Sequence, residues 1–248
     1  MSILLLSDAH LHGLDDPTQH ALLGFLDAVP FDELVIVGDL FDVWWSSDGS
    51  VPLDAVPVLS AFQRLAAAGR PVTWIAGNHD GRPSVEGLGI QVSEAWSRTV
   101  GAKRLLAVHG DEGADPRLRN RVLQRALRSG PVHTMGRALG THRVRAIGRV
   151  LANQSRRSHA AKRFDVLQRQ NELADRLLGA QADVVFVGHS HCPGMLPRRA
   201  GMLVNLGDWL HHRTYARVGP DAVRLFRWTG EETPMPEGPP QRWPWADR

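Results

Sequence analysis

The sequence predicts an α/β fold, and three features of the chain carry that prediction. Short apolar runs recur along the chain, each bounded by Gly, Asp or Asn. Segments with apolar residues at helical spacing lie between several of these runs, which is the alternation typical of α/β proteins. The chain has 248 residues, 43% of them hydrophobic, which is enough for one domain with a substantial core.

The apolar runs have the continuous hydrophobic character of strands that are buried on both faces. Six of them are expected to form strands: Ile3–Ser7, Leu34–Val37, Val72–Ala76, Leu105–His109, Val184–Val187 and Met202–Leu206. Two later runs, Tyr215–Val218 and Val223–Trp228, flank a Gly-Pro-Asp turn and predict a hairpin.

Helices are expected between the strands. Asp16 followed by Pro17 is a typical helix start, an N-cap residue before a proline in the first turn. A second helix is expected from about Asp54 to Ala68, ending at Gly69. Strand–helix–strand alternation implies right-handed crossovers and helices that cover the sheet.

Residues 114–181 lack a strand signal and predict a helical insertion. Its last stretch, with apolar residues from Phe164 to Leu178, is expected to return the chain to the core. Between Pro116 and Phe164 there is no Asp or Glu but many arginines, and such a positive face attracts anions. We therefore expect a main domain over residues 1–228 that contains this insertion, followed by a loosely held Pro-rich tail over residues 229–248.

The composition narrows the class of protein. The chain has one cysteine, Cys192, so a disulfide framework is excluded and a reducing compartment is favoured. The apolar stretch in MSILLLSD is too short for a signal peptide or a membrane span, and no other segment approaches spanning length. We expect a cytoplasmic protein that can still lie on a membrane surface.

Polar clusters follow five of the predicted strands, at the point where each strand ends. Because the ends of neighbouring strands lie side by side, these clusters can converge on one point. Carboxylates, an amide oxygen and imidazoles together form a ligand set for two divalent metals. The candidate ligands are Asp8, His10, Asp39, Asn78, His109, His189 and His191.

The order and content of the clusters resemble the calcineurin-like metallophosphoesterases, from Ile3 to about Asp208. The resemblance implies an αββα sandwich of two mixed sheets flanked by helices, with the insertion as a lid. It implies two divalent metal ions. Mn²⁺ is favoured, and Fe²⁺, Co²⁺ and Zn²⁺ are also compatible with oxygen and nitrogen ligands. Two such ions acidify a bridging water and aim it at phosphorus, so no protein nucleophile is required.

The family pattern also divides the ligands and assigns neighbouring residues. It implies that Asp39 bridges the two ions, with one group of ligands on each: Asp8, His10 and His191 on the first ion, and Asn78, His109 and His189 on the second. His79 resembles the family histidine that stabilises the transition state or protonates the leaving oxygen, with Asp80 orienting it.

Other polar residues are expected either to support the ligand histidines or to lie at the surface. Asp42, Asp111 and Asp208 also follow strand ends, and we expect them to support metal-bound histidines. The histidines outside these motifs, His211 and His212 among them, are expected at the surface.

A finer resemblance, to bacterial UDP-2,3-diacylglucosamine hydrolases, is carried by Gly38–Trp44, by the basic insertion after Asp111 and by Val204–Trp209. That family cleaves the pyrophosphate of a UDP-linked diacylated sugar, releasing UMP and a lipid phosphate for lipid A synthesis. The resemblance implies a lipid-nucleotide substrate, an insertion that receives acyl chains and a peripheral position on the cytoplasmic face of the inner membrane. Known members carry arginine after the asparagine, where this chain has His79. Candidates for phosphate or headgroup contact are Arg156, Arg157, Lys162 and Arg163.

Three other functions remain open at the level of sequence. One is a metallophosphoesterase that acts on a different phosphodiester or phosphomonoester, such as a nucleotide. Another is a nucleic-acid binder that uses the basic helices, although these helices lack the interleaved aromatic residues that stack on bases. The third is a catalytically silent interaction module, which would have no need of a complete ligand set.

Overall fold

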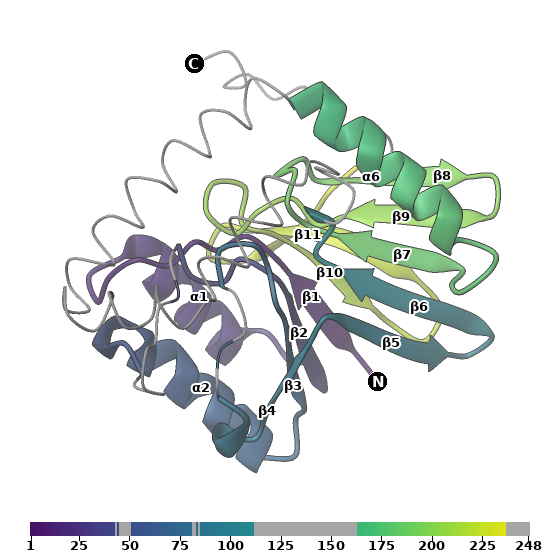
Figure 1. Ribbon diagram of the computed structural model, residues 1–248. Helices are drawn as coiled ribbons and strands as arrows, with labels where there is room; N and C mark the ends of the chain where they lie inside the picture. The colour runs from purple at the N-terminus through teal and green to yellow at the C-terminus, as the bar shows by residue number, and fades with distance from the viewer. Residues whose placement is uncertain (43, 45–50, 81–82, 84, 112–162, 237–248) are drawn as a thin grey trace.

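The protein is described by a computed structural model that covers residues 1–42, 44, 51–80, 83, 85–111 and 163–236. Two sheets lie in the middle of the molecule, with α1 and α2 on one side and α6 on the other (Figure 1). This is the αββα sandwich of two mixed sheets that the sequence predicts. The helices are α1 (Pro17–Ala28), α2 (Val56–Ala67) and α6 (Arg163–Leu177).

The first sheet has seven strands in the order β12-β11-β10-β1-β2-β3-β4. Strands β1 to β4 pair in parallel, and β10, β11 and β12 extend the sheet with antiparallel pairs. Their bounds are β1 Ile3–Leu6, β2 Glu33–Val37, β3 Val72–Ile75, β4 Ile90–Ser93, β10 Thr214–Val218, β11 Val223–Trp228 and β12 Glu232–Pro234.

The second sheet has five strands in the order β5-β6-β7-β9-β8. Its central strands β6, β7 and β9 are parallel, and β5 and β8 pair antiparallel at the two edges. The bounds are β5 Ala95–Val100, β6 Lys103–Val108, β7 Val184–Val187, β8 Gly194–Arg198 and β9 Gly201–Asn205. The first sheet therefore has four adjacent parallel strands and the second sheet has three, and within each sheet their carboxyl ends lie at one edge.

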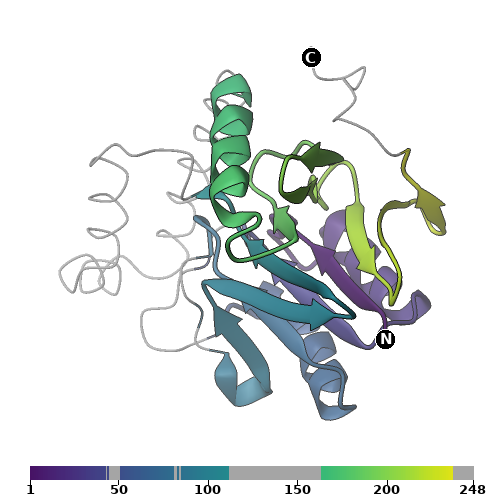
Figure 2. The same ribbon diagram turned by 90° about the vertical axis from the view of Figure 1, so that its right-hand side faces the viewer.

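The apolar residues divide between three core layers because successive side chains of a strand point to opposite faces. In β1, Ile3 and Leu5 lie in the core between the two sheets, whereas Leu4 and Leu6 belong to the core under α1 and α2. A third core lies between the second sheet and α6, which the views of Figures 1 and 2 both place against that sheet. Strands buried on both faces explain why the runs are apolar throughout.

The ends of the helices follow the expected local chemistry. The Asp16 carboxylate accepts a hydrogen bond from the Thr18 N–H (2.8 Å), which caps α1 ahead of Pro17. A short 3₁₀ turn, Leu53–Ala55, precedes α2. α1 begins at Pro17 as predicted, and α2 begins and ends within about two residues of its predicted bounds, which is the usual spread of helix assignment.

Several features differ from the sequence expectation. All six predicted buried strands and the hairpin are confirmed, but β4, β5 and β8 had not been predicted. Glu232–Pro234 lies in the predicted tail and instead pairs with β11 as an edge strand, because the β11 edge offers it free hydrogen-bonding groups. Phe164 is 79% exposed rather than buried, because the buried face of α6 carries Val166 and Leu173 instead.

Parts of two predictions fall outside the described residues. Residues 112–162 hold most of the predicted insertion, and residues 237–248 hold most of the predicted tail. Within the described part of the chain, no helix combines the length and apolar character needed to cross a membrane.

Candidate metal centre

The seven candidate ligands all follow the carboxyl ends of parallel strands. In the first sheet, Asp8 and His10 follow β1, Asp39 follows β2 and Asn78 follows β3. In the second sheet, one histidine follows β6 and two follow β7: His109, His189 and His191. Because β1, β2 and β3 are neighbours, and β6 and β7 are neighbours, the two sets of loops meet at one edge of the sandwich.

A hydrogen bond to a ligand carboxylate joins the loops of the two sheets. The Asp8 Oδ2 atom accepts the backbone N–H of His189 at 2.8 Å, although the two residues are 181 positions apart in the chain. Within the first sheet, the N–H of Asp8 donates to the carbonyl of Gly38 (3.0 Å) and that of His10 donates to the carbonyl of Asp39 (3.1 Å). These bonds hold the ligand loops of the two sheets in register.

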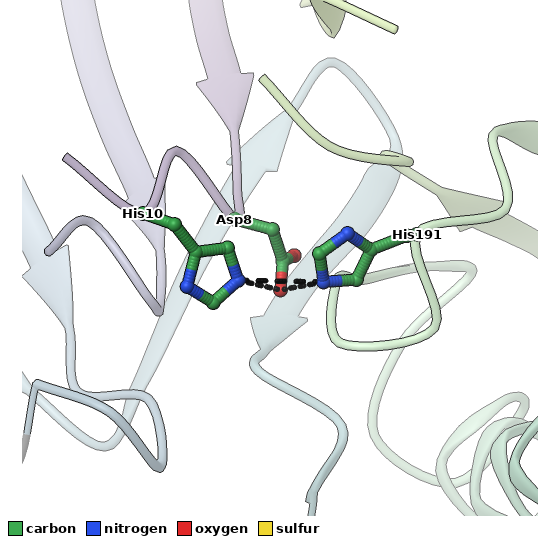
Figure 3. Close-up of side chains that lie close together, drawn as sticks. All are labelled: Asp8, His10 and His191. Atoms are coloured by element: carbon green, nitrogen blue, oxygen red, sulfur yellow. Dashed lines mark hydrogen bonds and ion pairs between the residues drawn. The ribbon is translucent and has the colours of Figure 1, made fainter. Parts of the chain in front are cut away.

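Asp8, His10 and His191 form the first ligand group, as Figure 3 shows. The Asp8 Oδ1 atom lies 3.3 Å from His191 Nε2 and 3.9 Å from His10 Nε2. The two Nε2 atoms are 3.4 Å apart. Two ligand atoms that are each about 2.1 Å from one ion lie about 3.0–3.4 Å apart. The spacings of 3.3 and 3.4 Å fit a shared cation, and the distance between Asp8 Oδ1 and His10 Nε2 is longer than this range.

Asp39, His109 and His189 form the second ligand group. The Asp39 Oδ2 atom is 3.4 Å from His109 Nε2, and Asn78 Oδ1 is 3.2 Å from the same nitrogen. The same Asp39 Oδ2 lies 4.0 Å from His10 Nε2 of the first group. The Asp39 carboxylate thus lies close to imidazoles of both groups. That it bridges two ions stays a prediction.

The donor atoms fit divalent cations. Among the described residues, the buried Asp8 Oδ1 atom accepts no hydrogen bond, although it faces two imidazoles. A buried carboxylate oxygen without a hydrogen bond is costly unless another positive group neutralises it. Carboxylate, amide and imidazole donors without a thiolate match Mn²⁺, Fe²⁺, Co²⁺ or Zn²⁺.

Glycines before two of the ligands leave room for their neighbours. A Cβ atom at Gly77 would lie 2.2 Å from Asp39 Oδ1, and one at Gly188 would lie 2.5 Å from Asp8 Oδ2. Any side chain at these positions would displace a ligand carboxylate. The Gly-Asn and Gly-His pairs of the sequence therefore reflect the close packing of one ligand loop against the next.

The carboxylates and imidazoles of the cluster shift one another's pKa values. Burial would raise the pKa of Asp39, but the nearby His109, His79 and His10 rings outweigh burial and hold this pKa well below its usual value. Burial would lower the pKa of His109, but the Asp39 carboxylate raises it well above 6.5. The same balance, with Asp8 and Asp208 as the carboxylates, raises the pKa of His191. Opposite charges at this spacing stabilise one another.

His79 lies beside the ligand groups with a defined orientation. Its Nδ1–H donates to the backbone carbonyl of Asp42 (2.8 Å), and its Nε2 lies 4.0 Å from Asp39 Oδ2. The ring packs edge-on against His10, with 4.8 Å between ring centroids. His79 also belongs to a third group of potential ligand atoms, with His10 and Asp42.

Asp80 does not take the position expected for it. Its carboxylate accepts the N–H groups of Leu40 (3.0 Å) and Phe41 (2.9 Å) and the Trp74 Nε1–H (3.0 Å). Burial and the charge of Asp39 raise its pKa to about 6. Asp80 therefore supports the turn after Asp39, and the group that orients His79 is the Asp42 carbonyl. Sequence adjacency could not separate these two roles because the partners lie about 40 positions away.

Two of the expected supporting carboxylates lie beside ligand histidines. Asp42 Oδ1 is 3.7 Å from His10 Nδ1, and Asp208 Oδ2 is 3.6 Å from His191 Nδ1. His109 uses a backbone group instead, because its Nδ1 bonds the Val37 carbonyl at 2.9 Å. The third carboxylate, Asp111, contributes to the raised pKa of His109. Partners of this kind fix the ring orientation of metal-binding histidines.

His212 was expected at the surface but is buried against Asp208. Its ring bonds the Asp208 carboxylate, which also accepts the backbone N–H groups of His211 and His212 (3.1 Å for the latter). These bonds hold Asp208 in place behind His191. In the sequence, the Gly-Asp-Trp motif after β9 draws attention to Asp208. Nothing in that motif distinguishes His212, the partner of Asp208, from the other histidines.

Four basic residues are predicted from the sequence to contact the substrate. Arg156, Arg157 and Lys162 lie outside the described residues, and Arg163 is the first residue of α6. Their contact with substrate stays a prediction.

Comparison with known proteins identifies the family of this chain. The profile of the calcineurin-like phosphoesterase family matches residues 1–193. The UDP-2,3-diacylglucosamine hydrolase of Sodalis glossinidius (strain morsitans) is 30% identical over 247 residues, which cover 92% of this chain and 99% of that protein. The protein of the same name from Serratia proteamaculans (strain 568) is 25% identical over 238 residues, with 92% and 99% covered.

A solved structure shares the fold. The E. coli phosphoesterase Yfce superposes with a TM-score of 0.51 and 14% identity, over 97% of this chain and 100% of that one. The matched profile includes every ligand position of both groups, from Asp8 to His191. This chain therefore belongs to the calcineurin-like phosphoesterase family and is a metal-dependent hydrolase.

Proposed function

We propose that this chain hydrolyses the pyrophosphate bond of UDP-2,3-diacylglucosamine, releasing UMP and 2,3-diacylglucosamine 1-phosphate, with two divalent cations at the two ligand groups. The observation that carries the substrate assignment is the match to relatives named for this reaction, which covers 92% of this chain. The match therefore extends beyond the shared ligand motifs into the insertion and the strands after His191.

The ligand geometry supports phosphoester hydrolysis. Two cations at these groups would supply an acidified water and neutralise charge on the phosphoryl oxygens. The chain contributes the bridging carboxylate of Asp39 and the rings of His10 and His109, one in each group. We propose Mn²⁺ as the native metal.

His79 is proposed to act on the leaving oxygen. Because its Nδ1–H is held by the Asp42 carbonyl, the other ring nitrogen, Nε2, faces the ligand groups. When protonated, that nitrogen can donate a hydrogen bond or a proton to the oxygen that departs from phosphorus. The role needs no contact between His79 and Asp80.

The basic segment before α6 is proposed to contact the substrate. Arg156, Arg157, Lys162 and Arg163 offer guanidinium and ammonium groups to a phosphate or headgroup. The absence of acidic residues between Pro116 and Phe164 supports contact with an anionic substrate or with the anionic cytoplasmic face of the inner membrane.

A second candidate function is hydrolysis of another phosphodiester or phosphomonoester. His79 favours it, since known UDP-2,3-diacylglucosamine hydrolases carry arginine at this place. The two candidates share the ligand groups and differ in what the insertion has to recognise.

Incubation with UDP-2,3-diacylglucosamine and Mn²⁺, followed by mass analysis, tests the proposal. We expect UMP and the lipid phosphate to form, and Asp39→Asn to abolish their formation. Asp27→Asn, on the exposed side of α1, is the matched control and should leave the rate unchanged. If the lipid nucleotide stays intact while bis(p-nitrophenyl) phosphate is cleaved, the second candidate function replaces the first.

A further inference from the structure

α6 carries a buried amide in the middle of its apolar face. Gln170 is 1% exposed, and the same face carries Val166, Leu173 and Ala174, within about one turn on either side. A buried amide destabilises a core unless its donors and acceptors are bonded. An apolar side chain of similar length would pack here without that requirement, so the partners of Gln170 indicate what it does.

Both ends of the amide reach the loop that carries two ligand histidines. The Gln170 Nε2 atom donates to the Gly188 carbonyl at 2.7 Å, directly before His189. Its Oε1 accepts from Asn205 Nδ2 at 3.1 Å. The same Asn205 nitrogen donates to Ser190 Oγ at 2.6 Å, between the two histidines. The residues on either side of His189 are therefore held by one buried network.

The amide also stands beside the neighbouring ligand loop. The Gly188 N–H donates to the carbonyl of His109 at 3.0 Å, so the loops after β6 and β7 are joined at this point. A Cβ atom at Gly110 would lie 2.9 Å from Gln170 Nε2. Gln170 thus packs where the loops of His109 and His189 meet, and these are the two imidazoles of the second ligand group.

Asn205 is itself fixed in place. Its Oδ1 accepts the Gly207 N–H at 3.1 Å, and the residue is 2% exposed at the end of β9. The network therefore connects a helix, a strand end and a ligand loop through side-chain amides that are all buried. Fully bonded networks of this kind fix one conformation of the groups they join.

We propose that Gln170 is a positioning residue for the second ligand group, holding the Gly188–Ser190 turn so that His189 faces Asp39 and His109. The inference rests on the proposed two-metal function. Because α6 lies within residues 114–181, the segment between two ligand motifs contributes to the metal centre through this amide.

A matched pair of variants on one helix tests the proposal. Gln170→Leu removes the amide and keeps an apolar side chain of similar size. Gln168→Leu is the control, because Gln168 is exposed and its amide donates a hydrogen bond to Glu172 on the same helix (3.2 Å). Each variant is titrated with Co²⁺, whose visible absorption reports the ligands of the bound ion. We expect Gln170→Leu to bind one of two Co²⁺ equivalents about tenfold more weakly or worse, with an altered spectrum. Gln168→Leu should match the unaltered chain.

A second variant covers the case in which Gln170→Leu does not fold. Ser190→Ala removes the hydroxyl that Asn205 holds, with little change of volume, and should weaken the same Co²⁺ equivalent to a smaller extent. Unchanged affinity and spectrum in both folded variants would overturn the proposal. Binding of fewer than two Co²⁺ ions by the unaltered chain would instead overturn the two-metal function, and this inference with it.

Discussion

Five of the seven ligand residues take a left-handed backbone conformation: Asp8 (φ 54°), His10 (47°), Asp39 (52°), His189 (64°) and His191 (56°). Non-glycine residues rarely adopt it, because the Cβ atom crowds the carbonyl oxygen at a cost of about 1–2 kcal/mol per residue. The strain occurs where each strand stops and its side chain must turn towards the shared point. Surrounding bonds, such as those of Asp80 to the Leu40 and Phe41 N–H groups, hold the loops in this form.

At the scale of single residues, His79→Ala separates catalysis from metal binding. We expect the kcat of phosphodiester hydrolysis to fall by about 10²–10⁴-fold, because a positioned proton donor is lost. Metal content, measured by mass spectrometry of the elements, should stay close to two ions per chain, because neither ligand group contains His79. His20→Ala, on α1, is the control. Loss of a metal ion in His79→Ala would show instead that this histidine is a ligand, as its place beside His10 and Asp42 allows.

Among the elements, β2 and β5 are joined across the two sheets by a buried carboxylate. Glu33, at the start of β2, accepts the Trp96 Nε1–H at 2.8 Å and the Arg98 guanidinium at 2.6 Å. Glu33 is 5% exposed and Trp96 is 7% exposed. The bonds lie at the end of β2 opposite Asp39, so they stabilise the packing of the sheets without contacting the ligand groups.

Glu33→Ala tests this separation of stability from function. We expect the free energy of unfolding to fall by about 1–3 kcal/mol, because a buried indole N–H loses its acceptor. Urea denaturation measures the loss, and metal affinity should be unchanged. Glu33→Gln keeps an oxygen for Trp96 and should lose less, while Glu94→Ala, at an exposed position, should lose little. A large drop in metal affinity in folded Glu33→Ala would contradict the assignment.

For the whole molecule, the ligand groups place carboxylates and imidazoles from both sheets in one buried cluster. Without a cation, the carboxylates raise the pKa of His109 and His191 well above 6.5, despite burial, and so hold these rings protonated. Protonated imidazoles contribute stability at low pH, which is lost as the pH rises through their raised pKa values. A cation needs the neutral rings, so its binding releases protons and strengthens with pH.

Metal removal should therefore destabilise the protein more at high pH. We expect the Tm to rise when Mn²⁺ is added to chelator-treated protein, and to rise further at about pH 8 than at about pH 6. Calorimetry with and without Mn²⁺ at each pH measures the difference. The same protein carrying Asp39→Asn should show a much smaller rise. An equal rise in Tm at both pH values would mean that metal binding does not displace protons from the His109 and His191 rings.

Most of the fold and all seven candidate ligands could be predicted from the sequence, because both depend on local pattern. A buried strand needs a continuous apolar run, and each ligand cluster follows such a run directly, as Asp8 follows Ile3–Leu6. The edge strands β4, β5 and β8 could not be predicted in this way. In these strands, β5 for example, many residues are exposed, and apolar and polar side chains do not alternate regularly enough to distinguish the strand from a loop.

The sequence by itself determined which residues form the parallel strands and which polar side chains stand at their ends, because spacing along the chain sets both. Only the tertiary structure decided that Asp80 bonds the turn after Asp39, that His212 is buried behind Asp208, and that Gln170 reaches the loop of His189. The choice of hydrogen-bond partner depends on which elements are packed together, and that is settled only when two sheets and a helix bring distant parts of the chain into contact.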